Sequence, residues 1–97
     1  MLISDINQKI REKLEKLEKN IEGMHFKFYE YYKGEAPTVP NWEEIERELL
    51  AFSQRTINDF QLSKNLDRIL FKFQNRKKIW LTWIEEVHHM SKNQKSS

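Results

Sequence analysis

The chain has 97 residues, of which 38% are apolar and 33% charged, and its formal net charge is +2. It contains no cysteine, which excludes disulfides, thiol catalysis and cysteine-ligated zinc, and its two glycines exclude a glycine-rich phosphate-binding loop. No apolar run approaches the ~20 residues of a membrane-spanning helix, and the first residues lack a signal-peptide pattern. We therefore expect one small, soluble, cytoplasmic domain that is all-α.

The first predicted helix covers residues 4–33. Its apolar residues recur at steps of three and four, which is the heptad spacing of helices that pack against other helices, as in a coiled coil. A stretch rich in glutamate and lysine in its first half supplies strong helix formers. Ser4 is predicted to cap its N-terminus.

Residues 34–40 are the only clear linker. Gly34 suits the position just after a helix, and the two prolines that follow it prevent continuation of the helix. A second helix is predicted over residues 41–58, with Asn41 as its N-cap and Glu44 as the partner in a capping box.

The boundary between the second and third helices is open, because neither glycine nor proline occurs after the linker. The heptad phase continues but places three polar residues in the apolar seam. A turn around residues 58–63 explains them, with Ser63 as the N-cap of a third helix over residues 63–90. One helix over residues 41–90 is the alternative; we favour the turn, because uncapped patterns much longer than about 25 residues are uncommon in globular domains. Residues 91–97 are expected to form a flexible tail.

The three predicted helices form an up-down-up bundle, because short connections favour antiparallel neighbours. The first and third helices are then parallel, and eight of the twelve aromatic residues come to one end of the bundle. These eight are Phe26, Phe28, Tyr29, Tyr31, Tyr32, Trp42, Trp80 and Trp83. Most of them fill the core, but Ile79 and Trp83 are placed roughly opposite Trp80, and a three-helix monomer cannot bury opposite faces of one helix.

Exposed apolar surface at this end predicts an interface with another protein molecule. The simplest form is a dimer that makes a larger helical bundle, since two-fold homodimers are the commonest oligomers. A different protein partner at the same end is the alternative. The expected interface residues are Phe26, Tyr29, Tyr32, Trp42, Ile79 and Trp83.

Charge is unevenly distributed along the chain. Residues 41–50 carry four acidic side chains and one basic, whereas residues 51–97 carry nine basic and four acidic. Basic residues at steps of four are expected to form a ridge on the face of the third helix opposite the apolar one. Such a ridge is able to contact phosphates of a nucleic acid; a solvated helix face or an acidic protein surface are the alternatives. The candidate nucleic-acid-binding residues are Arg55, Lys64, Arg68, Lys72, Arg76 and Lys77.

Each of the three histidines, His25, His88 and His89, follows a glutamate by three residues. Glu-x-x-His pairs build the di-metal sites of some helical bundles. Glutamates are so frequent in this chain that chance matches are expected, and we assign no metal ligand and no cofactor.

The sequence therefore predicts a non-enzymatic helical interaction protein, which is an adaptor, a regulator or a small subunit of a complex. Serines lie in caps and tails without the context of a catalytic triad, so no catalytic residue is assigned. Nucleic-acid binding through the basic ridge is the alternative function, and a metal-carboxylate bundle is the second alternative. No membrane attachment is expected, because no helix combines a basic flank with an exposed apolar face along its whole length.

Overall fold

The computed structural model describes residues 3–55 and 57–95, and side chains within residues 5–55 and 57–90. In this part of the chain all regular structure is helical, in three helices: α1 (Ile3–Tyr32), α2 (Glu43–Ser53) and α3 (Phe60–Lys95). The prediction of an all-α chain is confirmed, and α2 and α3 are separate helices. None of these described helices is long and apolar enough to cross a membrane.

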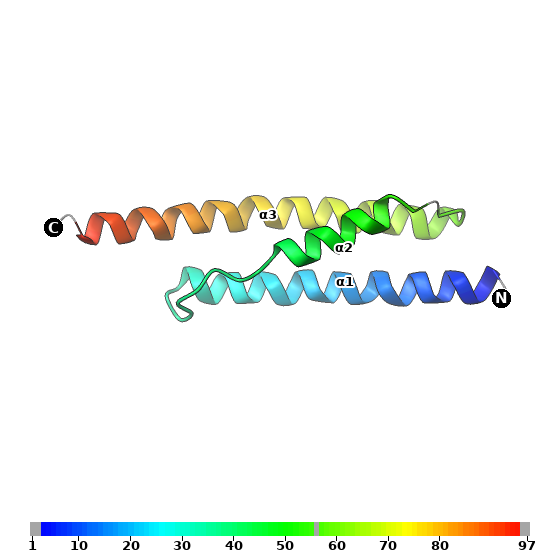
Figure 1. The fold of residues 1–97 in the computed structure, drawn as a ribbon, viewed down its shortest axis with the longest axis horizontal. Helices are drawn as coiled ribbons and strands as arrows, with labels where there is room; N and C mark the ends of the chain where they lie inside the picture. The colour runs from blue at the N-terminus through cyan, green and yellow to red at the C-terminus, as the bar shows by residue number, and fades with distance from the viewer. Residues whose placement is uncertain (1–2, 56, 96–97) are drawn as a thin grey trace.

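The molecule is a rod of 64 × 18 × 16 Å built on its two long helices. α1 and α3 lie side by side along the rod, and the short α2 packs across both of them (Figure 1). The residue numbers of contacting pairs increase in parallel along the two long helices. Asn7 contacts Asp59 near one end and His25 contacts Trp80 near the other, so α1 and α3 run in the same direction. At 1.5 Å per residue α2 is about 16 Å long, and it therefore covers only part of the α1–α3 pair.

One apolar core joins the three helices. Its buried members follow the heptad steps predicted for α1 and continue through the inner faces of α2 and α3. They are Leu14, Leu17, Ile21, Phe28, Ile45, Leu49, Phe52, Leu62, Leu66, Ile69, Phe73 and Trp80. Among the described side chains no buried polar atom lacks a hydrogen-bond partner, so the core is apolar with its polar contacts placed at its edges.

The ends of α2 differ from the prediction of a helix over residues 41–58. Trp42 is the N-cap, and it makes no side-chain capping hydrogen bond, so Asn41 and Glu44 do not form the predicted capping box. The helix ends at Ser53, after which the backbone N–H of Gln54 donates to the carbonyl of Leu50 and that of Arg55 to the carbonyl of Phe52. The linker behaves as expected, because Gly34 takes a φ of 86° two residues after the end of α1.

α3 begins earlier and ends later than predicted. The carboxylate of Asp59 accepts a 3.0 Å hydrogen bond from the backbone N–H of Leu62, so Asp59 caps the helix and Ser63 lies inside it. The helix continues to Lys95 through most of the predicted tail, because the chain offers no glycine or proline to stop it; residues 96–97 lie outside the described part. At the other end of the chain α1 already begins at Ile3, one residue before the predicted cap.

Candidate interaction surface

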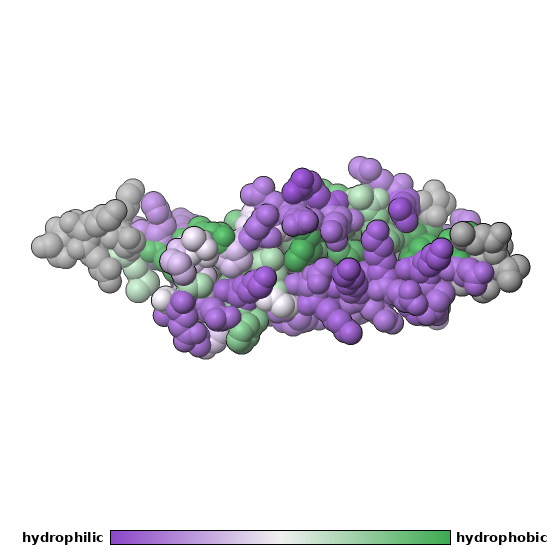
Figure 2. All heavy atoms as spheres, turned by 60° about the horizontal axis from the view of Figure 1, so that its bottom comes forward, coloured by the Kyte–Doolittle hydropathy of each residue, from purple (hydrophilic) through white to green (hydrophobic). Residues whose placement is uncertain are grey.

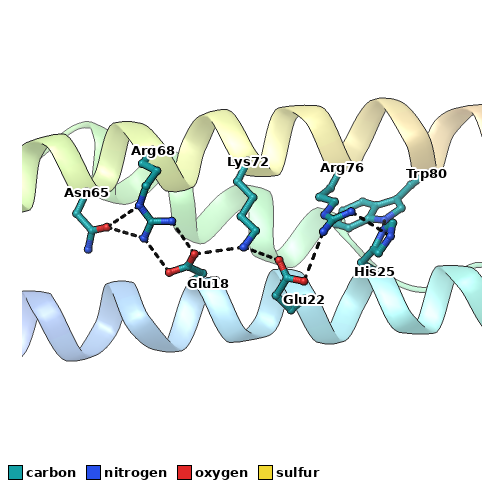
Figure 3. Close-up of polar contacts among 8 residues, drawn as sticks. All are labelled: Glu18, Glu22, His25, Asn65, Arg68, Lys72, Arg76 and Trp80. Atoms are coloured by element: carbon teal, nitrogen blue, oxygen red, sulfur yellow. Dashed lines mark hydrogen bonds and ion pairs between the residues drawn. The ribbon is translucent and has the colours of Figure 1, made fainter.

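The crease between α1 and α3 has two parts on the side away from α2. One part is a row of ion pairs, which we call the charge ladder and which consists of Glu18, Glu22, Arg68, Lys72 and Arg76 (Figure 3). The other part lies further along both helices, where Tyr29 and Tyr32 of α1 meet Trp83 of α3. Together with the exposed side chains of Phe26 and Ile79 on the same stretches of the two helices, these residues are called the aromatic patch. Hydrophilic side chains cover most of the face seen in Figure 2, and hydrophobic ones appear there as narrow areas.

The charge ladder begins with a two-pronged contact. Arg68 donates from Nη1 and Nη2 to the two carboxylate oxygens of Glu18 at 2.7 and 2.9 Å, which is the geometry that guanidinium groups favour with carboxylates. Asn65 fixes the guanidinium from within α3, because its Oδ1 accepts from Nε at 3.2 Å and from Nη2 at 2.7 Å. The pKa of Glu18 is lowered from 4.5 to about 2, chiefly by the hydrogen bond from Arg68 and further by Lys72.

The ladder continues through a lysine that contacts two glutamates. The Nζ atom of Lys72 lies 3.3 Å from Glu18 and 2.5 Å from Glu22, and Arg76 lies 3.5 Å from the second oxygen of Glu22. The hydrogen bond from Lys72 lowers the pKa of Glu22, and the same bond raises the pKa of Lys72. Two acidic residues of α1 therefore pair with three basic residues of α3.

The predicted position of the basic ridge, opposite the apolar face, is wrong. A four-residue step advances a helix by about 40° beyond one full turn, so residues spaced by four wind around it. Lys64 faces solvent, Arg68 is 54% exposed, and Lys72 and Arg76 are 30% exposed because the ridge has turned toward α1.

The remaining candidates for nucleic-acid binding lie on other surfaces. Lys77 contacts Glu46 of α2 at 2.6 Å and lies over the ring of Trp42. Arg55 follows the end of α2 and lies over the ring of Phe52. The six predicted residues thus do not form one continuous basic surface.

Trp80 anchors the aromatic half of the crease. Its side chain is fully buried, stacks on Phe28 at 4.9 Å between ring centroids, and meets Phe73 edge to face at 5.8 Å. Its indole Nε1 donates a 3.1 Å hydrogen bond to Nδ1 of His25. A large apolar side chain is thereby buried with its one polar atom satisfied.

Trp83 forms the next layer of rings outward. It stacks on His25 at 5.4 Å and on Tyr32 at 5.0 Å, and it lies 6.2 Å from Tyr29. The expectation that it lies opposite Trp80 is wrong, because three residues along a helix are only about 60° apart. Trp83 therefore packs on the ring that accepts the hydrogen bond of the buried tryptophan, and it is itself half-buried.

The outer rim of the aromatic patch remains in solvent. Phe26 is 64% exposed, Tyr29 45%, Tyr32 39% and Ile79 37%. Trp42 does not belong to this patch, because it lies under Lys77, which points to nearly the opposite side of α3 from Ile79. The structure thus places five of the six predicted interface residues on the same side.

His25 is the residue whose role sequence reasoning missed. Its Nδ1 faces Trp80, and its Nε2 lies 3.1 Å from Nη1 of Arg76 (Figure 3). Burial and then the charge of Arg76 lower the pKa of His25, and the charge of Glu22 opposes them. A Glu-x-x-His match is the only sequence signal here, and it points to metal binding instead of to a tryptophan.

The two side chains of the Glu-x-x-His pair of α1 have other partners in the structure. Glu22 is occupied by Lys72, and His25 faces two hydrogen-bond donors. In the described part of the chain no group of three or more potential ligands is placed to hold a metal ion. His88 and His89 lie on the exposed face of α3.

No family model, curated protein or solved structure matches this chain significantly.

Proposed function

We propose that this chain is a non-enzymatic interaction protein, an up-down-up bundle that binds a second copy of itself through the aromatic patch. The observation that carries the proposal is the aromatic patch itself. Its rings lie beyond the charge ladder and remain partly exposed to solvent. Tyrosine, tryptophan and phenylalanine are enriched in protein interfaces, because they combine large apolar area with low conformational entropy.

The rigidity of the patch supports the same proposal. Trp83 holds Tyr29 and Tyr32 in place from α3, so that these side chains lose little further freedom on binding. Phe26 stands one turn before Tyr29 and extends the patch around α1. A preorganised aromatic surface costs less to bury in an interface than a flexible one.

The geometry favours association over the nucleic-acid alternative. Arg68, Lys72 and Arg76 already contact glutamates, so a phosphate would have to displace carboxylates that lie 2.5 to 3.5 Å away. The gain from each phosphate contact would be offset by the loss of an existing ion pair.

The test of the proposal is the molar mass in solution, with two phenylalanines as a matched pair. We expect the wild type to exceed the 11.9 kDa of one chain in multi-angle light scattering and Phe26→Glu to return to it. Phe71→Glu is the control, because Phe71 is 66% exposed against 64% for Phe26 but lies outside the patch. A wild type of monomer mass at every concentration would overturn the proposal, as would equal loss of association in both variants.

A further inference from the structure

His25 lies beneath the aromatic patch and contacts both tryptophans of α3. Its ring is 5.4 Å from that of Trp83 in a stacked arrangement and 6.4 Å from that of Trp80 in a tilted one. α1 and α3 are joined at this point by a hydrogen bond from the indole of Trp80. The side chain therefore ties the outer aromatic layer to the buried one.

The hydrogen bond from Trp80 fixes the state of the imidazole. Trp80 and Arg76 both only donate, and a neutral imidazole has one unprotonated nitrogen, so only one of these two contacts of His25 is a hydrogen bond. The tautomer with Nδ1 unprotonated gives the fully buried indole its acceptor and turns Nε2–H toward Arg76, which is 30% exposed and also contacts Glu22. Protonation of Nδ1 would set two N–H groups against each other. The indole N–H of a fully buried side chain would then lack its acceptor, which is costly in a protein interior.

The charge of Arg76 also disfavours the imidazolium, and the charge of Glu22 opposes this effect. Arg76 of α3 places a permanent positive charge 3.1 Å from Nε2. Glu22, one turn earlier on α1, would favour an imidazolium, but its carboxylate already contacts Lys72 and Arg76. Among the described charged residues, Arg76 and Glu22 are the groups that face His25, and Arg76 is the closer of the two.

We infer that His25 is a proton-sensitive lock on the aromatic patch. The neutral ring holds Trp80 and Trp83 in the positions that build the patch, and the imidazolium releases them. Association through the patch is therefore strong at neutral pH and lost in mild acid. This inference rests on the proposed function, because it concerns regulation of the same surface.

The lock is measured first without reference to association. The indole N–H resonance of Trp80 is followed by NMR in the dilute protein between about pH 7.5 and about pH 5, a range in which histidine is the side chain that ordinarily titrates. We expect the resonance to move toward the position of a solvent-bonded indole as His25 takes up a proton. The ring nitrogens of His25 report the tautomer in the same spectra. A Trp80 resonance that stays constant down to about pH 5 overturns the lock.

The lock is then tested through its effect on association. We expect the association constant of the wild type to fall several-fold over this pH range, because uptake of a proton by His25 favours the released state. His25→Gln is expected to associate equally at both ends of the range, because its amide oxygen accepts from the indole and does not titrate. His25→Asn, which also has an amide oxygen and does not titrate, is expected to behave like His25→Gln. His89→Gln is the control and is expected to keep the pH response of the wild type.

The outcomes separate the two proposals. A Trp80 resonance that responds to pH in a protein that never associates supports the lock and overturns the proposed function. Association that is equal at both ends of the pH range, with an unchanging Trp80 resonance, supports the function and overturns the lock. A pH response that persists in His25→Gln also overturns the lock.

Discussion

The two halves of the crease between α1 and α3 are held together by different interactions. The charge ladder joins side chains that keep between 25% and 54% of their surface in solvent. The aromatic half joins rings around Trp80, which is fully buried. Exposed ion pairs are screened by salt and contribute about 0 to 1 kcal/mol each, whereas a buried tryptophan contributes several-fold more. Within the crease, the buried ring therefore contributes more to stability than any one ion pair of the charge ladder.

Register is also set by the aromatic half. Both glutamates and all three basic residues of the charge ladder are spaced by four, so a slip of α3 by one turn would still bring opposite charges together. The same slip would separate Trp80 from His25 and Trp83 from Tyr32. No aromatic ring lies four residues from either tryptophan on α3 to replace it. The ladder thus favours the pairing of α1 with α3, and the rings select one alignment.

The two halves are expected to respond to acid at different pH. The pKa of His25 is lowered below 6.5, so the stability of the aromatic half is complete above pH 6.5 and is lost as the pH falls through the folded-state pKa. The pKa of Glu18 is lowered from 4.5 to about 2, so the contribution of the ladder is complete above pH 4.5 and is lost as the pH falls through about 2. The aromatic half weakens first.

The largest effect on this comparison is expected from Trp80→Ala. Removal of the buried ring should lower the free energy of unfolding by about 3–5 kcal/mol, because it leaves a cavity against Phe28 and Phe73. Trp80→Phe keeps a ring and loses the indole N–H, so its cost should be smaller. Urea denaturation followed by circular dichroism measures both variants. A loss under about 1 kcal/mol for Trp80→Ala would show that the aromatic half does not dominate stability.

A smaller effect is expected from Glu18→Gln, which removes the carboxylate shared by Arg68 and Lys72. The expected loss is about 1–2 kcal/mol in low salt, because charge-assisted hydrogen bonds exceed neutral ones, and less in high salt because of screening. Glu15→Gln is the matched control, an exposed glutamate of α1 outside the ladder. The loss in Trp80→Ala should not change with salt. Equal salt dependence of the two losses would contradict the division of the crease.

The sequence predicted those features of the fold that depend on local spacing. The heptad steps of α1 correctly placed Leu14, Leu17, Ile21 and Phe28 in the core, and Gly34 correctly marked the end of the helix. The ends of α2 and α3 were less predictable, because several polar residues compete to cap a helix. Asp59 rather than Ser63 makes the capping bond, and only the local backbone geometry decides between them.

The contacts of the site were predictable only in part, because they depend on how α3 is aligned against α1. The steps of four revealed the basic ridge, but its winding around the helix carries Arg76 to α1 and leaves Lys64 in solvent. The hydrogen bond between Trp80 and His25 joins residues 55 positions apart, and no local pattern encodes that pairing. Exposed rings such as Phe26 were easier to predict, because they lie outside the apolar heptad steps that mark the core.

The smallest effect is expected from Gly23→Ala, at the boundary between the two halves on α1. A Cβ at this position would meet nothing within 4 Å, and the backbone there does not have the positive φ seen at Gly34. Alanine should therefore raise the free energy of unfolding by up to about 1 kcal/mol, because glycine has the lower helix propensity. Thermal denaturation should show a rise in Tm of up to about 8 °C. Because neither half is altered, the losses caused by Trp80→Ala and Glu18→Gln should be the same in the Gly23→Ala background. A change in only one of them would show that this part of α1 couples to that half, and the two halves would then not be independent.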